Sequence, residues 1–520
     1  MPSSAPGVVV NVTAAASNPY GNAPTGTWFV LGNAQGPSGV PVPITSMNDF
    51  VTYFGSIQNG QVTGRYTITN VDSTPLYDAL DVYFREGGIL AYVSRVVSST
   101  AVVAASGSAG LIKFSAVGAG TWANSASGSA AGVIITISSA VTGQYGVTIK
   151  YNGTTMATSP TLYSDTDVKN WVNSLPKYQA LVVATTQSGT TNLPSAGNTT
   201  TIYVGSGTGS TPGTDVAVVD ADADAALTCI TDKYGVGQVS YPGNTAAAVY
   251  VKLGNHAAAN SRVAILDAAD TATAATLTSA VSTFQSAVTD PSYAAFFGPW
   301  LVVPGISNVN PASTSSVVFN RTVAPSALAA AKMALTDTAS DCNVPAAGLT
   351  NGSSAYAVNT SQTYSSADRA SLNNGGVNVI RAIPNIGTIA VYGFRSAALD
   401  PNWQYLNNVR FRMQIMRDFD IIAESFVFQE IDGRGQVFAK FAGALSGQCQ
   451  AYWLRKSLYG ATPGASFSVN TGTQVNTPAT IAAGQINAQV NVRMSPFGEF
   501  VTVSVTKYLA NAPLPTTSNA

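Results

Sequence analysis

The chain has 520 residues, only 9% of them charged, and a formal net charge of −1 at pH 7. This length is enough for two to four domains with separate cores. The low charge argues against nucleic-acid binding by clustered Lys and Arg. A charged fraction of about 25% is usual, so the composition favours either an extracellular β protein rich in Ser, Thr and Ala or a subunit that its neighbours largely cover.

Cysteines and targeting segments restrict the compartment. Cys229, Cys342 and Cys449 are widely spaced and odd in number, so they predict neither a disulfide framework nor a metal motif. No run of about 18 apolar residues predicts a membrane span. The first residues lack the basic segment of a signal peptide, so we expect synthesis in a cytoplasm without secretion.

Residues 1–22 form a predicted N-terminal arm. Prolines break any helix there, and several valines favour an extended segment: Val8, Val9, Val10 and Val12. Such a segment is either a disordered tail or a strand that adds to the open sheet edge of a neighbour. The residues alone leave both alternatives open.

Residues 23–97 predict an α/β unit. Thr27–Leu31 has the composition of a short buried strand, and Ser46–Phe54 that of a short helix capped by Ser46. A second helix begins at Pro75, with apolar residues at helical spacing, and Gly87-Gly88 ends it. The β-branched and aromatic residues of Ile89–Val97 then predict a strand.

The composition changes after Val97, where Ser, Thr, Gly and Ala predominate up to about residue 200. Turn residues separate three predicted strands and one helix: Val133–Ile137, Tyr145–Lys150, Leu181–Ala184 and Asp165–Leu175. We expect an inserted small β domain over residues 98–200.

Helices and strands alternate over residues 201–379. The predicted strands are Val236–Tyr241, Arg262–Asp267 and Ala294–Val303, and the predicted helices are Ala221–Tyr234, Ala246–Gly254, Thr273–Val288 and Val323–Asp337. This alternation is typical of a mostly parallel α/β layer.

The last 140 residues carry two long predicted helices, which begin near Asp400-Pro401 and at Gln436. Apolar residues alternate from Ile486 to Met494, which predicts a strand with one buried face. The same alternation recurs at Val501, Val503 and Val505, before a Pro- and Thr-rich end.

Few residues suggest catalysis or ligand binding. His256 is the single histidine and has no GxSxG or HExxH motif beside it, so we interpret it as solvated or capping. Gly205–Ser210 lacks the GK(S/T) of a phosphate loop. Four aspartates raise the possibility of Ca²⁺, but they lack an EF-hand pattern and are better explained as the start of a helix: Asp215, Asp220, Asp222 and Asp224.

Three blocks near the N-terminus resemble the contractile phage tail sheath family. Leu76–Val96 has the form LYDAL-x-x-(F/Y)F-x-x-GG followed by AYVxRV. Upstream, Gly26–Gly32 precedes Ala-Gln-Gly-Pro, and Ile44–Ser46 precedes Asp-Phe and Phe-Gly pairs. The order and spacing of the blocks are similar to those of the family.

Later blocks extend the resemblance. Gly120–Asn124 resembles the family's Gly-x-Trp-Gly-Asn turn, although Ala123 replaces a glycine. Leu406-Asn407 with Arg410, and Thr477–Gly484, resemble its C-terminal domain. The resemblance covers roughly residues 24–97 and 400–500, and the middle only by organisation.

The resemblance implies an α/β and α+β multidomain fold. Both chain ends would build an inner α/β domain, from residues 23–97 and 380–505. A subtilisin-like middle α/β domain would span 201–379, and the β-rich insert 98–200 would project outward. Arms 1–22 and 506–520 would be exchanged with neighbours through Val8, Val9, Val10, Val12, Val501, Val503 and Val505.

The same resemblance gives a role to six cations on the two C-terminal helices: Arg410, Arg412, Arg417, Lys440, Arg455 and Lys456. They would face a tail tube and set its register. From the residues alone, they are equally well explained as ordinary solvated helix faces with weak ion pairs.

The implied function is structural. Copies would stack as sixfold rings around the tail tube protein, contact baseplate and tail terminator proteins, and contract to drive the tube through the host envelope for genome ejection. We expect no enzyme activity, cofactor, direct nucleic-acid contact or membrane insertion. The protein would be part of the virion and would assemble in the host cytoplasm.

Two alternatives stay open. One is the sheath of a phage-derived tailocin or extracellular contractile injection system. The other, from a different class, is a secreted β-rich adhesin or surface-layer protein, which Ca²⁺-dependent assembly would favour. An enzyme dependent on His256 is a third and weaker interpretation, and replacement of that histidine would test it.

Overall fold

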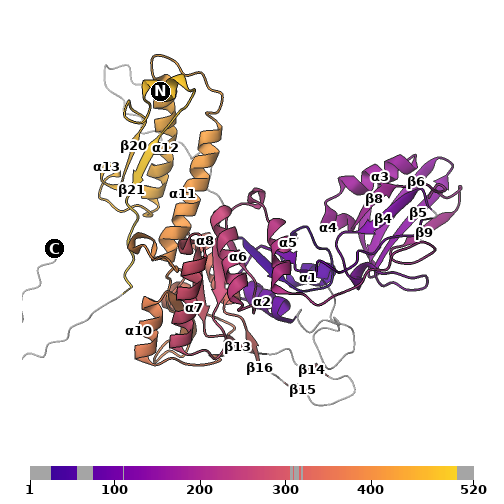
Figure 1. Cartoon of the computed structure of the whole chain (residues 1–520), viewed down its shortest axis with the longest axis horizontal. Coiled ribbons are helices and arrows are strands. Elements are labelled where there is room, and N and C mark those ends of the chain that lie inside the picture. Colours follow the sequence, from indigo (N-terminus) through magenta and orange to yellow (C-terminus); the bar gives the residue numbers. More distant parts are fainter. Residues whose placement is uncertain are drawn as a thin grey trace, which may run out of the picture.

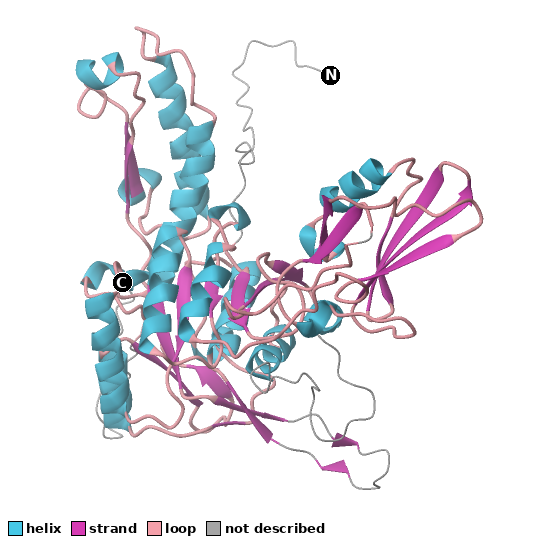
Figure 2. Ribbon diagram, turned by 45° about the vertical axis from the view of Figure 1, so that its right-hand side comes forward, coloured by secondary structure: helices cyan, strands magenta, loops and turns pink. Residues whose placement is uncertain are grey.

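An α/β body carries two projecting units in the computed structural model of the chain (Figure 1). The structure describes residues 25–54, 74–108, 110–304, 308–309, 316–317 and 320–499. One projecting unit is the insert after the first hundred residues, and the other is helical and comes from the C-terminal part (Figure 2). None of the helices in the described ranges is long and apolar enough to cross a membrane.

The body is built on a sheet of eight strands in the order β19-β18-β12-β11-β10-β1-β3-β2. The six inner strands are parallel, and the two outer strands are antiparallel to their neighbours. Their bounds are β1 Trp28–Gly32, β2 Val42–Ile44, β3 Ala91–Arg95, β10 Gln238–Ser240, β11 Val263–Asp267, β12 Ala294–Gly298, β18 Val377–Ala382 and β19 Ile389–Val391.

Helices cover both faces of this sheet, so alternate residues of one strand enter two different cores. Trp28 and Val30 pack with α2 (Thr74–Arg85) and α8 (Ser326–Ala339). Phe29 and Leu31 pack on the opposite face with α5, α6, α7 and α10. These four helices span Ala223–Thr228, Ala247–Ala259, Ala274–Ala287 and Ser366–Asn374. Burial on both faces explains the continuous apolar composition of the parallel strands.

Most predicted elements of residues 23–97 are confirmed. The short helix is α1, Met47–Phe54, and the backbone N–H of Asp49 donates to Ser46 Oγ at 3.3 Å. The carboxylate of Asp49 accepts from the N–H of Thr45, one residue before the expected capping-box position. The second helix begins at Thr74 and leads into β3.

The eight-stranded sheet crosses one predicted domain boundary. The prediction places residues 23–97 with 380–505 in a domain separate from 201–379, but β1 pairs with β3 on one side and with β10 on the other. Residues 23–97 and 201–379 therefore share one sheet. Hydrophobic patterns identify a strand but not its neighbours, so the pairing was not available from sequence. The likeness of the middle region to a subtilisin-like fold stays a prediction.

One predicted strand is divided in the structure. Ala294–Val303 forms β12 and β13 (Leu301–Pro304), which belong to different sheets. Pro299 lies between them and has no N–H to continue the ladder of β12. β13 pairs instead with β16 (Asn320–Val323) and β17 (Asn359–Thr360) in a small antiparallel sheet.

The insert has its own core and two antiparallel sheets, as the composition predicted. β5, β6, β7 and β9 form the larger sheet, and β4 pairs with β8. It extends past the predicted end at residue 200, because a bridge joins Val102 to Thr214. The bounds are β4 Ile112–Ala116, β5 Val133–Val141, β6 Gln144–Tyr151, β7 Thr154–Thr158, β8 Val182–Thr186, β9 Thr199–Tyr203, α3 Asp165–Ser174 and α4 Lys177–Ala180.

The C-terminal unit rises from the body on a long helix, α11 (Leu406–Glu424). Leu406, Val409 and Met413 belong to the core of the body, whereas Ile422 packs in a separate core with α12 (Gln436–Leu454). One continuous helix thus joins the unit to the body. The remaining elements are α13 Pro463–Ser466, β20 Phe467–Asn470, α14 Pro478–Ala482 and β21 Gln489–Val492.

Candidate assembly surfaces

A two-stranded antiparallel sheet lies against α11 and α12. β20 pairs with β21 so that Phe467 faces Val492 and Val469 faces Val490. These four side chains pack on the two helices. Within the described ranges the sheet has no third strand. A two-stranded sheet is marginal by itself, and its outer edges offer N–H and C=O groups to a further strand.

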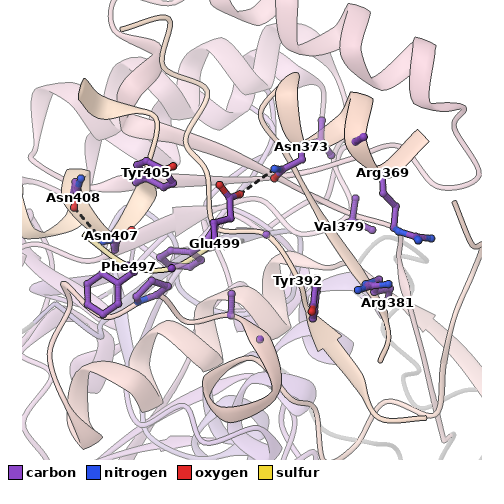
Figure 3. A pocket seen from close by; sticks show the side chains of 18 of the residues that line it. Arg369, Asn373, Val379, Arg381, Tyr392, Tyr405, Asn407, Asn408, Phe497 and Glu499 are labelled. Atoms are coloured by element: carbon purple, nitrogen blue, oxygen red, sulfur yellow. Dashed lines mark hydrogen bonds between the residues drawn. The ribbon is translucent and has the colours of Figure 1, made fainter. Parts of the chain in front are cut away.

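The predicted arm residues lie outside the described part of the chain: Val8, Val9, Val10, Val12, Val501, Val503 and Val505. The described residues nearest to the two arms are hydrogen-bonded to the body. Thr25 Oγ1 donates to Asp337 Oδ2 at 2.5 Å. At the other end of the chain, Glu499 accepts from Arg395 Nη2 at 2.6 Å. It also accepts from Asn373 Nδ2 at 3.0 Å (Figure 3).

Arg410 does not face solvent, contrary to its prediction as a tube-facing residue. Its side chain is 2% exposed and is ion-paired with Asp337 of α8. The first half of α11 is buried in the body, so Arg410 is buried although it lies off the face formed by Leu406, Val409 and Met413. A buried charge needs a partner, and Asp337 supplies it. Burial raises the pKa of Asp337, and Arg410 opposes that shift.

Arg412 is also held within the chain. Its guanidinium lies 4.6 Å from the ring centre of Tyr293 and 4.3 Å from that of Trp403. Nη2 donates to Ser292 Oγ at 2.9 Å. These contacts join α11 to the loops before β12 and before α11 itself, so Arg412 positions the helix.

Four of the six predicted cations keep access to solvent. Arg417 is partly exposed and lies 3.4 Å from Asp420. Lys440 and Lys456 are exposed. Arg455 is exposed too, with a loose ion pair of 3.6 Å to Asp341. No contact in the structure assigns them a partner molecule, so their role toward a tube stays a prediction.

His256 is partly buried near the end of α6. Arg262 Nη1 lies 3.0 Å from its Nε2, which therefore accepts the hydrogen bond. Burial, and then the neighbouring Arg262, lower the pKa of His256 to about 4. The ring is thus a neutral acceptor that holds the Arg262 guanidinium, so it is less solvated than the sequence predicted.

The four aspartates do not converge on one point. Asp215 pairs with Arg95, Asp222 accepts from the N–H of Ser99, and the other two lie beside Asn244 and Lys252. Among the residues that the structure describes, no group of three or more His, Cys, Asp or Glu side chains is placed to hold a metal. The Gly205 N–H donates to the Ala105 carbonyl, so that glycine-rich segment belongs to the insert.

Sequence reasoning missed a cavity of about 700 Å³ between α10, the β18–β19 edge and residues 494–499 (Figure 3). Arg369, Arg381, Tyr392 and Phe497 line it. Arg369 lies on α10 and Arg381 on β18, so their convergence on one cavity depends on how the helix packs beside the strand, which no sequence pattern indicates. A second missed feature did have a sequence signal: Phe426-Val427-Phe428 is an apolar run in the loop between α11 and α12, and Phe428 is fully exposed.

Comparison with solved structures shows where this architecture occurs. No family model matches the sequence, and no curated protein matches it either. A chain of the anti-feeding prophage baseplate is similar over 98% of this chain and 100% of its own, with 16% identity and a TM-score of 0.56. The contracted helical sheath of the same particle matches 97% of this chain and 99% of its own, with 17% identity and a TM-score of 0.54.

The chain has the fold of contractile sheath proteins. A sheath tail protein of Listeria innocua supports this, with 12% identity, a TM-score of 0.54, and coverage of 87% of this chain and 89% of its own. The resemblance seen in the sequence blocks is thereby confirmed at the level of the fold. At these sequence identities the comparisons establish the sheath fold, because proteins that share a fold can differ in function.

Proposed function

We propose that this protein is the structural subunit of a contractile sheath. Copies polymerise as stacked sixfold rings around a tail tube, and contraction drives the tube through a cell envelope. The observation that carries the proposal is the match of nearly the whole chain to a contracted helical sheath. Partial matches would support only a shared domain.

The geometry supports polymerisation through the arms. The sheet β20–β21 has open edges and a buried apolar face, and the β-branched valines of both arms are suited to extend such a sheet. Main-chain hydrogen bonds give such a joint its strength, while the arm's other end stays tied at Thr25 or Glu499. Neighbours can then move relative to one another without separating.

Two kinds of particle fit the sheath fold. In a phage tail, the sheath would surround the tube below a capsid, meet baseplate and tail terminator proteins, and serve genome ejection. We favour this on the sequence blocks. A phage-derived extracellular injection system is the second candidate, because the match to the anti-feeding prophage chains covers nearly all of this chain and of theirs.

Electron microscopy of the purified recombinant protein tests the proposal. We expect hollow striated cylinders or stacked rings in negative stain. Monomers that stay dispersed, and that do not assemble on the cognate tube when it is added, would refute a sheath role. Particles purified from the producing culture separate the two candidates, because a phage tail carries a DNA-filled capsid and an injection system does not.

A further inference from the structure

The loop between α11 and α12 presents an exposed aromatic side chain at the end of the C-terminal unit. We call residues 425–435 the tip loop. Phe428 is fully exposed and has a left-handed backbone, with φ of 63°. A bulky residue is rarely found there, because its Cβ crowds the backbone. Val427 beside it is half exposed. A monomer gains nothing from this arrangement, whereas an interface would bury both side chains.

The tip loop is acidic around these apolar residues. Glu424, the last residue of α11, and Glu430 in the loop are exposed. Asp432 caps α12, since it accepts from the N–H groups of Gln436 and Val437 at 3.1 Å each. Arg434 is the one cation of the loop. An apolar knob with a net negative rim results.

The cavity at the base of the C-terminal unit has the complementary character. Arg381 stacks over Tyr392 at 4.0 Å, and its buried Nε has no hydrogen-bond partner in the part of the chain that the structure describes. Arg369 donates to the carbonyl of Tyr364 at 2.6 Å. Neither arginine has an ion pair among the described residues. Glu499 is the acid of the lining, and Arg395 already neutralises it.

Size and lining suit an aromatic knob. The cavity holds about 700 Å³, within the range of about 300–1,000 Å³ that is usual for binding pockets. Exposed rings of Tyr392, Tyr405 and Phe497 line it. Aromatic pairs contribute binding free energy beyond that of their buried area. Hydrogen bonds between arginines and carboxylates would fix the orientation of the loop in the cavity.

The tip loop cannot reach the cavity of its own chain. Asn407 and Asn408 at the start of α11 line the cavity, whereas the loop follows Glu424 at the other end of the helix. At a rise of about 1.5 Å per residue, the two points lie roughly 25 Å apart along α11. We infer that the tip loop of one copy docks in this cavity of a second copy, with Phe428 inserted and with Glu424 and Glu430 beside Arg369 and Arg381.

Such a contact joins two different surfaces of the same protein. Head-to-tail contacts of this type generate rings or helical filaments. The inference rests on the proposed function, because it requires that copies assemble. It differs from arm exchange in that it needs no strand addition and lies wholly within the described residues.

Charge exchange tests the contact. We expect Arg369→Glu with Arg381→Glu, or Glu424→Arg with Glu430→Arg, to raise the critical concentration for assembly about tenfold or more, because opposed like charges cost over 1.4 kcal/mol. The chain with all four changes should regain assembly. Phe428→Ser should act in the same direction as the single reversals. Sedimentation at a series of protein concentrations measures each.

Controls separate the contact from misfolding and from the proposed function. Tyr163→Ala removes an exposed aromatic ring on the insert, and Lys150→Glu with Lys169→Glu reverses two of the insert's cations; assembly should be unchanged in both. Circular dichroism confirms folding of each variant. If wild-type protein fails to assemble, the proposed function fails. If wild type and both reversed chains assemble equally, or the fourfold variant stays impaired while folded, the docking is wrong.

Discussion

Arg410 of α11 is ion-paired with Asp337 of α8, and their side chains are only 2% and 8% exposed. The pair lies where the C-terminal unit enters the body. Thr25, the first described residue, also donates to Asp337. The carboxylate of Asp337 therefore joins the long helix, the body and Thr25, which follows the N-terminal arm, so movement of the arm or of the helix would act on the same contact.

Loss of Arg410 should destabilise the fold. In Arg410→Met, Asp337 is left buried without its cation, which costs about 3–5 kcal/mol in the free energy of unfolding. Urea denaturation of unassembled protein measures this. Arg417→Met is the matched control on the same helix; its ion pair is exposed, so we expect a change below about 1 kcal/mol. Equal effects of the two changes would contradict the assignment.

Asp215 should hold the insert in its orientation. It pairs with Arg95, the last residue of β3, whose side chain is 2% exposed. Burial lowers the pKa of Arg95 to about 10, and Asp215 opposes that shift. In Asp215→Ala we expect faster proteolysis near residues 97–103 and 211–216, where the chain enters and leaves the insert. Asp224→Ala, which removes a surface pair with Lys252, serves as control. Identical cleavage rates would rule out this role.

His256 should make stability depend on pH. Its pKa falls from 6.5 to about 4 on folding, so the unfolded chain binds a proton that the native chain does not. Stability therefore decreases as pH falls from about 6.5 to 4, by about 1.4 kcal/mol per unit. His256→Gln keeps an acceptor for Arg262 and should lack this slope, while assembly near neutral pH should be unchanged. An unaltered slope in urea titrations would refute the prediction.

Asp267 should act in the opposite direction over a similar range. Burial raises its pKa from 3.8 to about 6, although it accepts from Ser326 and Gly243. The native chain then binds the additional proton, so stability decreases as pH rises from about 4 to 6. The two slopes offset each other in wild type. Asp267→Asn should therefore show a steeper loss of stability on acidification than wild type, measured by the same titrations.

Removal of either arm should abolish polymerisation and leave the body intact. Chains without residues 1–20 or 506–520 retain every described element, so we expect soluble folded monomers by circular dichroism and light scattering. Negative-stain microscopy should show no cylinders. Circular dichroism of each truncated chain controls for its folding. Normal sheaths from either truncation would contradict the role of that arm in assembly.

Local patterns were sufficient for most elements of this protein. The helix from Pro75 to the paired glycines, the strand after it, and the alternation that became β21 each depend on residues close in sequence. Hydrophobic periodicity, proline and glycine act over a few residues, so a short stretch of sequence is enough to predict a helix or a strand from them. The sheath fold itself was recognisable for the same reason, since its sequence blocks coincide with such elements.

Only the tertiary structure decided which elements meet. The pairing of β1 with β10 joins residues about two hundred positions apart, and no pattern within β1 indicates its neighbour. Arg410 is buried because the first half of α11 packs inside the body. Arg369 and Arg381 line the same cavity because α10 packs beside β18. Long-range packing sets the surroundings of a side chain, so the sequence determined the elements and the structure determined which of their residues are free to bind.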